Sequence, residues 1–254
     1  MEMIKKFLMV KIVLIILFIV LAGVSFFMIS EKMSSPSFYA NIIMSLDKSR
    51  DRVMELTAAS IASSSAITIL PGDVGTPIAQ ELANMGKYFL IVLCAIYLEK
   101  FLLTVTGLVA FKYIIPAACF LLILFIFSNE KMFAKIAAKL FVFGLVISFT
   151  IPVSVNIGKM IEDNYAQTVQ ATLDRARDDT QTVKESAEKA NGDSNMFEKI
   201  INDISGNVNE LLKKFENTLS AFIEAVAVLI VTSCLIPVGV MLFFAQIIKF
   251  IFAI

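Results

Sequence analysis

The sequence predicts an all-α integral membrane protein with about four to five transmembrane helices and a protruding, coiled-coil-like antiparallel helical hairpin. The chain is 58% hydrophobic and only 17% charged, whereas a soluble domain is usually about 45–50% apolar and 25% charged. Several uncharged runs approach or exceed the length of about 20 residues that a helix needs to cross a bilayer. Between Met196 and Ile236 the apolar residues follow the heptad spacing of a helix that packs against another helix.

Residues 1–30 are predicted to form an N-terminal transmembrane helix. Lys5, Lys6 and Lys11 precede the uncharged run Ile12–Ile29. A signal peptide has a shorter apolar core, of about 7–15 residues. We therefore expect a retained helix whose N-terminus faces the cytoplasm, because basic residues favour that side.

Residues 31–86 are predicted to be a helical extramembrane segment. Ser35-Pro36 is a typical helix start, and the small-residue tract Ala58–Ala66 would let helices approach closely. Leu70–Pro77 contains two Pro and two Gly and predicts a turn, after which Thr76-Pro77 starts another helix. The stripe expected to be buried, which Ser49 interrupts, consists of Ile42, Leu46, Val53 and Leu56.

Residues 87–157 are predicted to hold transmembrane helices, and two interpretations of Tyr88–Phe127 stay open. The segment makes either two crossings or one net crossing. One crossing places the short lysine-bearing segments in the cytoplasm and both acidic regions outside, as the positive-inside rule requires. We therefore favour four crossings in total. The next apolar run, Leu140–Val155, contains Pro152, which can kink a helix.

Residues 158–219 are predicted to form the helical hairpin and residues 220–254 the C-terminal transmembrane helix. The break between the two arms is expected at Asn191–Asn195. The returning arm is expected to continue through Leu219 into lipid as one helix. Its seam, in the hairpin or between subunits, consists of Phe197, Ile201, Ile204, Val208, Leu211, Phe215 and Phe222.

The composition disfavours several function classes. The chain has no His, and its three Cys lie in apolar runs, so it offers no catalytic triad and no structural zinc site. We expect no catalytic residue, cofactor or metal. The polar regions Glu31–Glu81 and Lys159–Glu216 are both net acidic, which disfavours nucleic-acid binding.

The candidate functional residues are charges in or beside apolar runs. Glu99, Lys100, Lys112 and Glu224 form a possible intramembrane polar site, because charges at membrane depth usually face protein or a water-filled cavity. A second group shares one helical face and is expected to contact anionic lipid: Lys131, Lys135 and Lys139.

These patterns favour a non-enzymatic structural or interaction subunit in the inner or plasma membrane of a bacterium. We expect it to contact membrane lipid and to form a homo-oligomer or join other subunits of an envelope assembly. One alternative is a channel or transporter that uses Glu99, Lys100 and Lys112. Another is a transmembrane sensor that signals through the hairpin.

Overall fold

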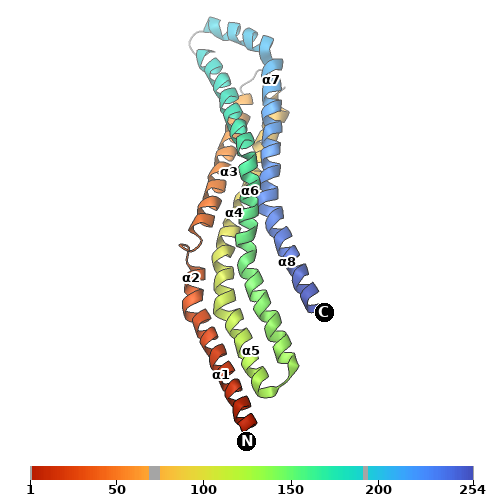
Figure 1. The fold of residues 1–254 in the computed structure, drawn as a ribbon. Coiled ribbons are helices and arrows are strands. Elements are labelled where there is room, and N and C mark those ends of the chain that lie inside the picture. The colour runs from red at the N-terminus through yellow and green to blue at the C-terminus, as the bar shows by residue number, and fades with distance from the viewer. Residues whose placement is uncertain (1, 69–74, 191–193, 254) are drawn as a thin grey trace. The chain divides into compact units, whose positions relative to one another are not determined.

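The structure is a computed structural model. It describes the backbone of residues 2–68, 75–190 and 194–253, and their side chains apart from residues 2–8, 34, 186–209 and 251–253. The described part is almost entirely helical and contains no strand (Figure 1), which confirms the all-α prediction. The helices are α1 (Glu2–Val24), α2 (Ser30–Ser34), α3 (Ala40–Ile67), α4 (Thr76–Val109), α5 (Ile115–Ser128), α6 (Lys131–Ala190), α7 (Ser194–Ile230) and α8 (Ile236–Ala253). Short π-helical segments join several of them: η1 (Ser25–Ile29), η3 (Ala110–Ile114) and η4 (Val231–Leu235).

Within the described residues, four helical stretches are long and apolar enough to cross a membrane: Met9–Met33, Thr76–Ser128, Lys131–Glu185 and Glu210–Phe250. The ambiguous segment Tyr88–Phe127 lies within one unbroken helical stretch of 53 residues, α4–η3–α5. No turn divides it, as two crossings would require. At 1.5 Å per residue it is about 80 Å long, well beyond a hydrocarbon core of about 30 Å.

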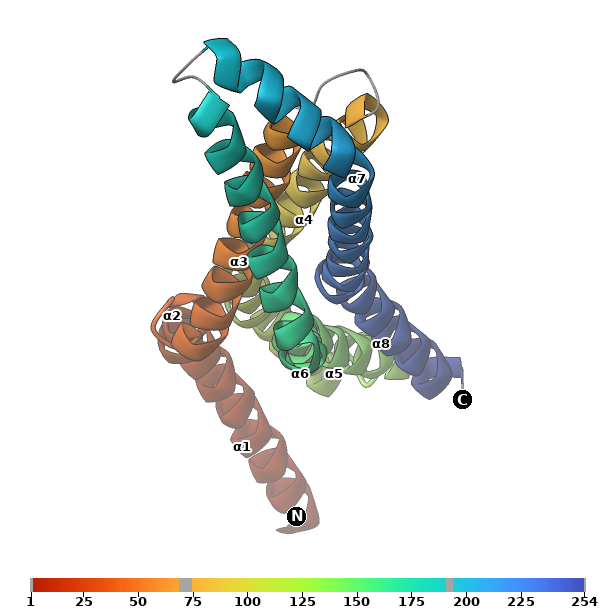
Figure 2. The same cartoon turned by 90° about the horizontal axis from the view of Figure 1, so that it is seen from above.

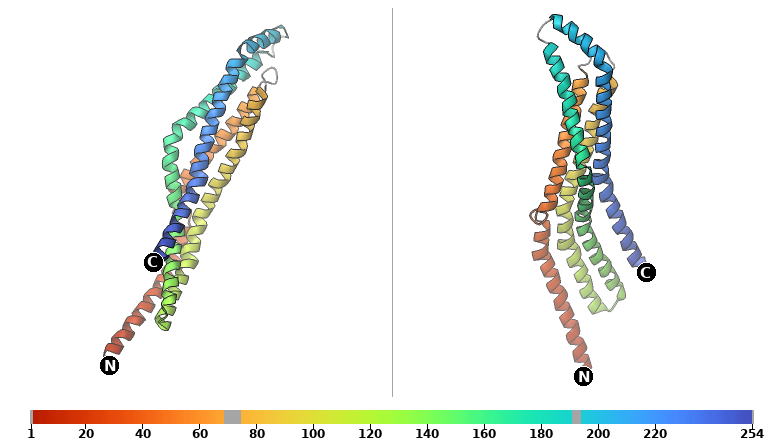
Figure 3. Two further views of the ribbon diagram at one scale, coloured as in Figure 1. Left: turned by 90° about the vertical axis from the view of Figure 1, so that its right-hand side faces the viewer. Right: turned by 45° about the horizontal axis from the view of Figure 1, so that its top comes forward.

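The chain divides into two compact units. The first comprises Met1–Met44, Leu98–Asn156 and Ile236–Ile254, and the second comprises Ser45–Tyr97 and Ile157–Leu235. Four helical stretches contribute residues to both units without a non-helical residue between: α3, α4, α6 and α7–η4–α8 (Figure 3).

In the first unit, α1 runs antiparallel to η3 and α5. Ser25 Oγ donates a hydrogen bond of 2.7 Å to Phe111 O, and Lys11 Nζ donates one of 3.2 Å to Ile126 O. The ammonium group of Lys11 thus lies near the C-terminal end of α5, where the helix dipole favours a cation. The start of α1 and the end of α5 therefore lie at the same end of this unit.

Helices α5 and α6 are also antiparallel. Asn129 ends α5 in the left-handed conformation, with φ 57°, and its N–H donates to Phe125 O at 2.8 Å. Farther along α6, Gly144 faces η3, since a Cβ there would lie 2.9 Å from Ile114 Cγ2. The first turns of α6 consequently lie at the same end of the first unit as the start of α1.

In the second unit, α3 and α4 form an antiparallel pair. Ser64 Oγ donates to Ala79 O at 2.7 Å, and Gly75 lies against Ile67. The predicted helix start at Thr76 is confirmed, while residues 69–74 of the predicted turn lie outside the described residues.

Helices α3 and α6 run in the same direction. Ser49 contacts Glu162, and farther along both helices Ser63 Oγ lies 3.4 Å from Thr180 Oγ1. The predicted stripe on α3 is buried at Leu46, Val53 and Leu56, and Ser49, Ser60 and Ser63 share the buried side. The small residues allow the two helices to lie close together.

Helices α6 and α7 are antiparallel. Asp179 contacts Thr218, and Gly158 lies against η4, where a Cβ would be 3.2 Å from Thr232 O. Residues 191–193, in the predicted break between the arms, lie outside the described residues, but α6 ends at Ala190 and α7 begins at Ser194.

The rings of Phe89 in α4 and Phe222 in α7 pack edge to face, with their centroids 6.2 Å apart. This contact joins α4 to α7. The second unit is therefore a four-helix bundle in which α3 contacts α4, α4 contacts α7, α7 contacts α6 and α6 contacts α3 (Figure 2). Because α3 is parallel to α6 and antiparallel to α4, and α7 is antiparallel to α6, α4 and α7 run in the same direction.

The side chains of three residues of the predicted seam are described. Phe215 and Phe222 are fully buried and Leu211 is half-buried. The seam residues Phe197, Ile201, Ile204 and Val208 lie outside the described side chains. Helix α7 runs through Leu219 without interruption, as predicted.

One helix start differs from the prediction. Helix α3 begins at Ala40, and Pro36–Tyr39 form a turn instead of its first residues. The Oγ of Ser35 contacts the hydroxyl and the N–H of Ser37 at the start of this turn.

Candidate functional site

Of the four charges proposed as an intramembrane site, Glu99, Lys100 and Lys112 belong to the first unit and Glu224 to the second. Glu99 is buried and Lys100 half-buried in α4, whereas Lys112 lies thirteen residues farther along the same helical stretch, about 20 Å away at 1.5 Å per residue. Lys112 Nζ lies 5.7 Å from the ring centre of Phe26, a cation–π contact. Glu224 belongs to the second unit and is exposed.

The lysine row keeps its predicted position on one exposed side of α6. Lys131, Lys135 and Lys139 are all exposed. They lie at the end of the first unit where α1 begins, so basic residues distant in the sequence gather at one end. This is the distribution that anionic headgroups would favour.

The structure also reveals buried carboxylates that the sequence did not single out. Glu162 of α6 is 7% exposed and accepts hydrogen bonds from two groups on α3: Ser49 Oγ at 2.6 Å and Arg52 Nη1 at 2.9 Å. A buried carboxylate is tolerated when it is paired and hydrogen-bonded. The α3–α6 contact thus has one preferred register, the one that brings these groups opposite Glu162.

Charged groups surround this contact on the exposed side of α3. Arg50 donates to Asp51 Oδ1 at 2.7 Å, and this hydrogen bond raises the pKa of Arg50 above its ordinary value. Glu55 pairs with Arg177 of α6 at 3.7 Å. Exposed pairs of this kind add little stability.

The second buried carboxylate is Asp179, which is 8% exposed. It accepts a hydrogen bond of 2.6 Å from Thr218 Oγ1 of α7, a hydroxyl that is only 1% exposed. Thr218 is the residue that interrupts the apolar heptad of α7. The interruption therefore places a donor opposite a buried acceptor, and it fixes the register of α7 against α6.

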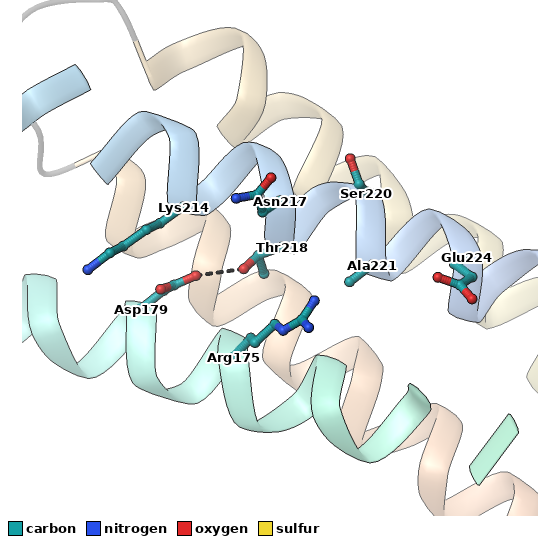
Figure 4. Close-up of a pocket in the computed structure, with 8 residues that line it drawn as sticks. All are labelled: Arg175, Asp179, Lys214, Asn217, Thr218, Ser220, Ala221 and Glu224. Atoms are coloured by element: carbon teal, nitrogen blue, oxygen red, sulfur yellow. Dashed lines mark hydrogen bonds between the residues drawn. The ribbon is translucent and has the colours of Figure 1, made fainter. Parts of the chain in front are cut away.

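Asp179 also lines a pocket of about 510 Å³ between α6 and α7 (Figure 4). Lys214 and Asp179 lie near one end of it and Glu224 at the other, and Arg175 projects from α6 between them. The pocket thus presents two basic and two acidic groups, with Asn217, Thr218 and Ser220 as neutral polar neighbours. Such a lining can hold a polar group with charges of either sign.

Among the residues whose structure is described, no group of three or more potential ligands could hold a metal ion. Sequence reasoning missed Ser49, Glu162, Asp179 and Thr218. A usable signal was present, because Ser49 and Thr218 each interrupt an apolar stripe at a position that the helical period requires to be buried.

A scan against models of protein families and searches of curated proteins and of solved structures find no match to this chain.

Proposed function

We propose that this protein is a non-enzymatic subunit of a membrane assembly, in which the four-helix bundle of the second unit stands outside the bilayer and holds neighbouring subunits. The observation that supports this most is helical continuity. Helices α4, α6 and α7 all belong to the bundle, and all three lie within stretches long and apolar enough to cross a membrane. A change in position of the bundle on binding a neighbouring subunit would be transmitted to the membrane segments through unbroken helices.

The polar contacts inside the bundle support the same proposal. Buried carboxylate contacts are a weak source of stability, but they penalise every register that leaves one partner unpaired. Glu162 and Asp179 act in this way on two of the four helix pairs. A bundle with a fixed register presents fixed outer faces, which an assembly subunit requires.

The test is the mass of the full chain in lipid nanodiscs and mild detergent, over a range of protein-to-lipid ratios. The proposal predicts multiples of the 28.1 kDa chain, or co-purification of a defined membrane partner at constant stoichiometry. A chain that stays at 28.1 kDa at every ratio, and that brings no partner from native membranes, would contradict it.

A channel or transporter is the second candidate, and the burial of Glu99 in an apolar helix favours it. The measurement is ion flux into liposomes for the native chain and for Glu99→Gln. This hypothesis predicts flux from the native chain and a change in rate or selectivity in the variant. It fails if neither protein conducts.

A further inference from the structure

The contacts in the bundle show which residues lie at the same height. Arg52 is twelve residues before Ser64 in α3, and Ile91 is twelve residues after Ala79 in α4. Since Ser64 and Ala79 touch and the helices are antiparallel, Arg52 and Ile91 lie level with each other. By the same argument Met54 lies level with Phe89.

Helices α4 and α7 run in parallel from their contact at Phe89 and Phe222. Ile91 is two residues after Phe89, and Ile223 is one residue after Phe222. The heights of Ile91 and Ile223 along the bundle therefore differ by only one residue. Their side chains are 57% and 52% exposed. Tyr88, the residue before Phe89, is exposed as well.

One height of the bundle therefore has two unlike sides. On α3 this height carries the charged run Lys48–Glu55, with its Arg50–Asp51 pair and the Arg52–Glu162 contact. On α4 and α7 it carries an apolar surface, called here the α4–α7 face. The exposed members of this face are Tyr88, Ile91, Cys94 and Ile223.

Lipid is a poor occupant for the α4–α7 face. If acyl chains covered it, the charges of α3 at the same height would also lie at membrane depth, where each charge is costly. Exposed apolar surface outside the bilayer is instead typical of a protein contact. Because α4 and α7 both belong to membrane-spanning candidates, a second copy in the same membrane can stand beside them at this height.

We propose that the α4–α7 face binds the same face of a second copy of this chain, in a parallel pair whose two-fold axis is perpendicular to the membrane. Both copies insert in the same orientation, so such an axis places α4 of one copy opposite α7 of the other. Ile91 of each copy then faces Ile223 of its partner. This proposal deepens the proposed function by naming the partner and the surface.

Charge complementarity favours a second copy over an unrelated helix. Glu81 is eight residues before Phe89 and Lys213 is nine before Phe222, so in the pair each exposed Glu81 lies level with a Lys213 across the interface. Lys87 lies between the heights of Glu216 and Glu224, which are also exposed. Glu81 and Lys87 thus each lie within four residues in height of an opposite charge on α7, which favours a parallel pair.

The test uses disulfide formation between separate full-length chains in nanodiscs or native membranes. In a background with Cys94→Ser, Cys119→Ala and Cys234→Ala, a chain with Ile91→Cys is mixed with a chain with Ile223→Cys. Because residues 91 and 223 face each other across the axis, oxidation should give a covalent dimer of the two different chains. The matched control is Met54→Cys, which is 53% exposed at nearly the same height on α3 and should cross-link much more slowly.

A second variant tests the face without engineered cysteines. Ile91→Glu together with Ile223→Glu should raise the dissociation constant of the dimer about a hundredfold or more, because the pair then contains four carboxylates in a desolvated contact. Helicity, followed by circular dichroism, should be unchanged since both positions are exposed in the single chain. Met54→Glu should leave the dimer intact.

The outcomes separate this proposal from the proposed function. A native dimer that survives both Glu substitutions, or that cross-links faster at position 54, would overturn the α4–α7 face while leaving an assembly subunit. A native chain that is monomeric and without a partner would overturn both. An environment-sensitive probe at position 91 can also be measured in chains diluted to one per nanodisc. If it reports a lipid environment, lipid and not a second copy covers the α4–α7 face, and the proposal is overturned.

Discussion

Removing the hydroxyl of Thr218 tests the claim that buried carboxylates fix the bundle. Thr218→Val keeps the shape of the side chain but removes the donor that lies 2.6 Å from Asp179 Oδ2. A hydrogen bond to a charged group contributes about 1.5–3 kcal/mol. Asp179 also lines the open pocket, so water can replace part of the lost contact, and we expect the lower end, about 1.5–2 kcal/mol.

For a protein of this size each kcal/mol lowers Tm by about 2–4 °C, so Thr218→Val should lower Tm by about 3–8 °C. The assay is thermal unfolding of the full chain in mild detergent, followed by far-UV circular dichroism. The matched control is Thr182→Val on the exposed side of α6, where the hydroxyl donates to the Asp178 carbonyl of its own helix. The control should change stability by less than about 0.5 kcal/mol.

A double-mutant cycle separates the contact from the two residues themselves. Asp179→Leu combined with Thr218→Val removes both polar partners, and it should cost less than the sum of the single changes by roughly 1–2 kcal/mol. Strict additivity, or a Thr218→Val variant as stable as the Thr182→Val control, would refute the reasoning.

Two further predictions concern the first unit. Gly107→Ala should sharply lower the yield and Tm of the folded protein, because a Cβ would lie 2.5 Å from the Met33 carbonyl oxygen, whereas Gly23→Ala, with nothing within 4 Å, should be tolerated; equal behaviour of the two variants would show that this close approach does not exist. Replacing the lysine row by Gln should weaken the association of detergent-solubilised protein with anionic lipid relative to neutral lipid, and an unchanged preference in a lipid-binding assay would remove its proposed role. The lysines to be replaced are Lys131, Lys135 and Lys139.

The features that follow from local periodicity were predictable. A stripe such as Leu46, Val53 and Leu56 has one helical spacing and hence one buried side, whatever covers it. The same holds for Phe215 and Phe222 of the seam, and for the continuity of α7 through Leu219, where no breaker residue occurs.

The membership of α4 in the bundle was not predictable. From Tyr88 onward its composition is that of a membrane span, and only the contact of Phe89 with Phe222 shows that this part packs within the second unit. The sequence pattern records hydrophobicity but not the height of a residue relative to a neighbouring helix. The sequence pattern alone therefore does not show that the bundle has two unlike sides.

The candidate sites show the same limit. Glu99 and Lys112 stand out as charges among apolar residues, yet their separation along one helix is incompatible with a direct contact. Ser49 and Thr218 are weak interruptions of a stripe, and their roles depend on which carboxylate the partner helix presents. The contact between η1 and η3, through Ser25 and Phe111, is likewise a tertiary feature with no periodic signal.

The central claim is that the four-helix bundle stands outside the bilayer, on the side opposite the lysine row. Side-specific thiol labelling tests it directly, with Asn164→Cys on the exposed side of α6 in the second unit and Glu130→Cys just before α6, each in the cysteine-free background. A membrane-impermeant maleimide added to intact cells should label position 164, and it should label position 130 only after the membrane is permeabilised. Labelling of both positions from the same side would contradict the account.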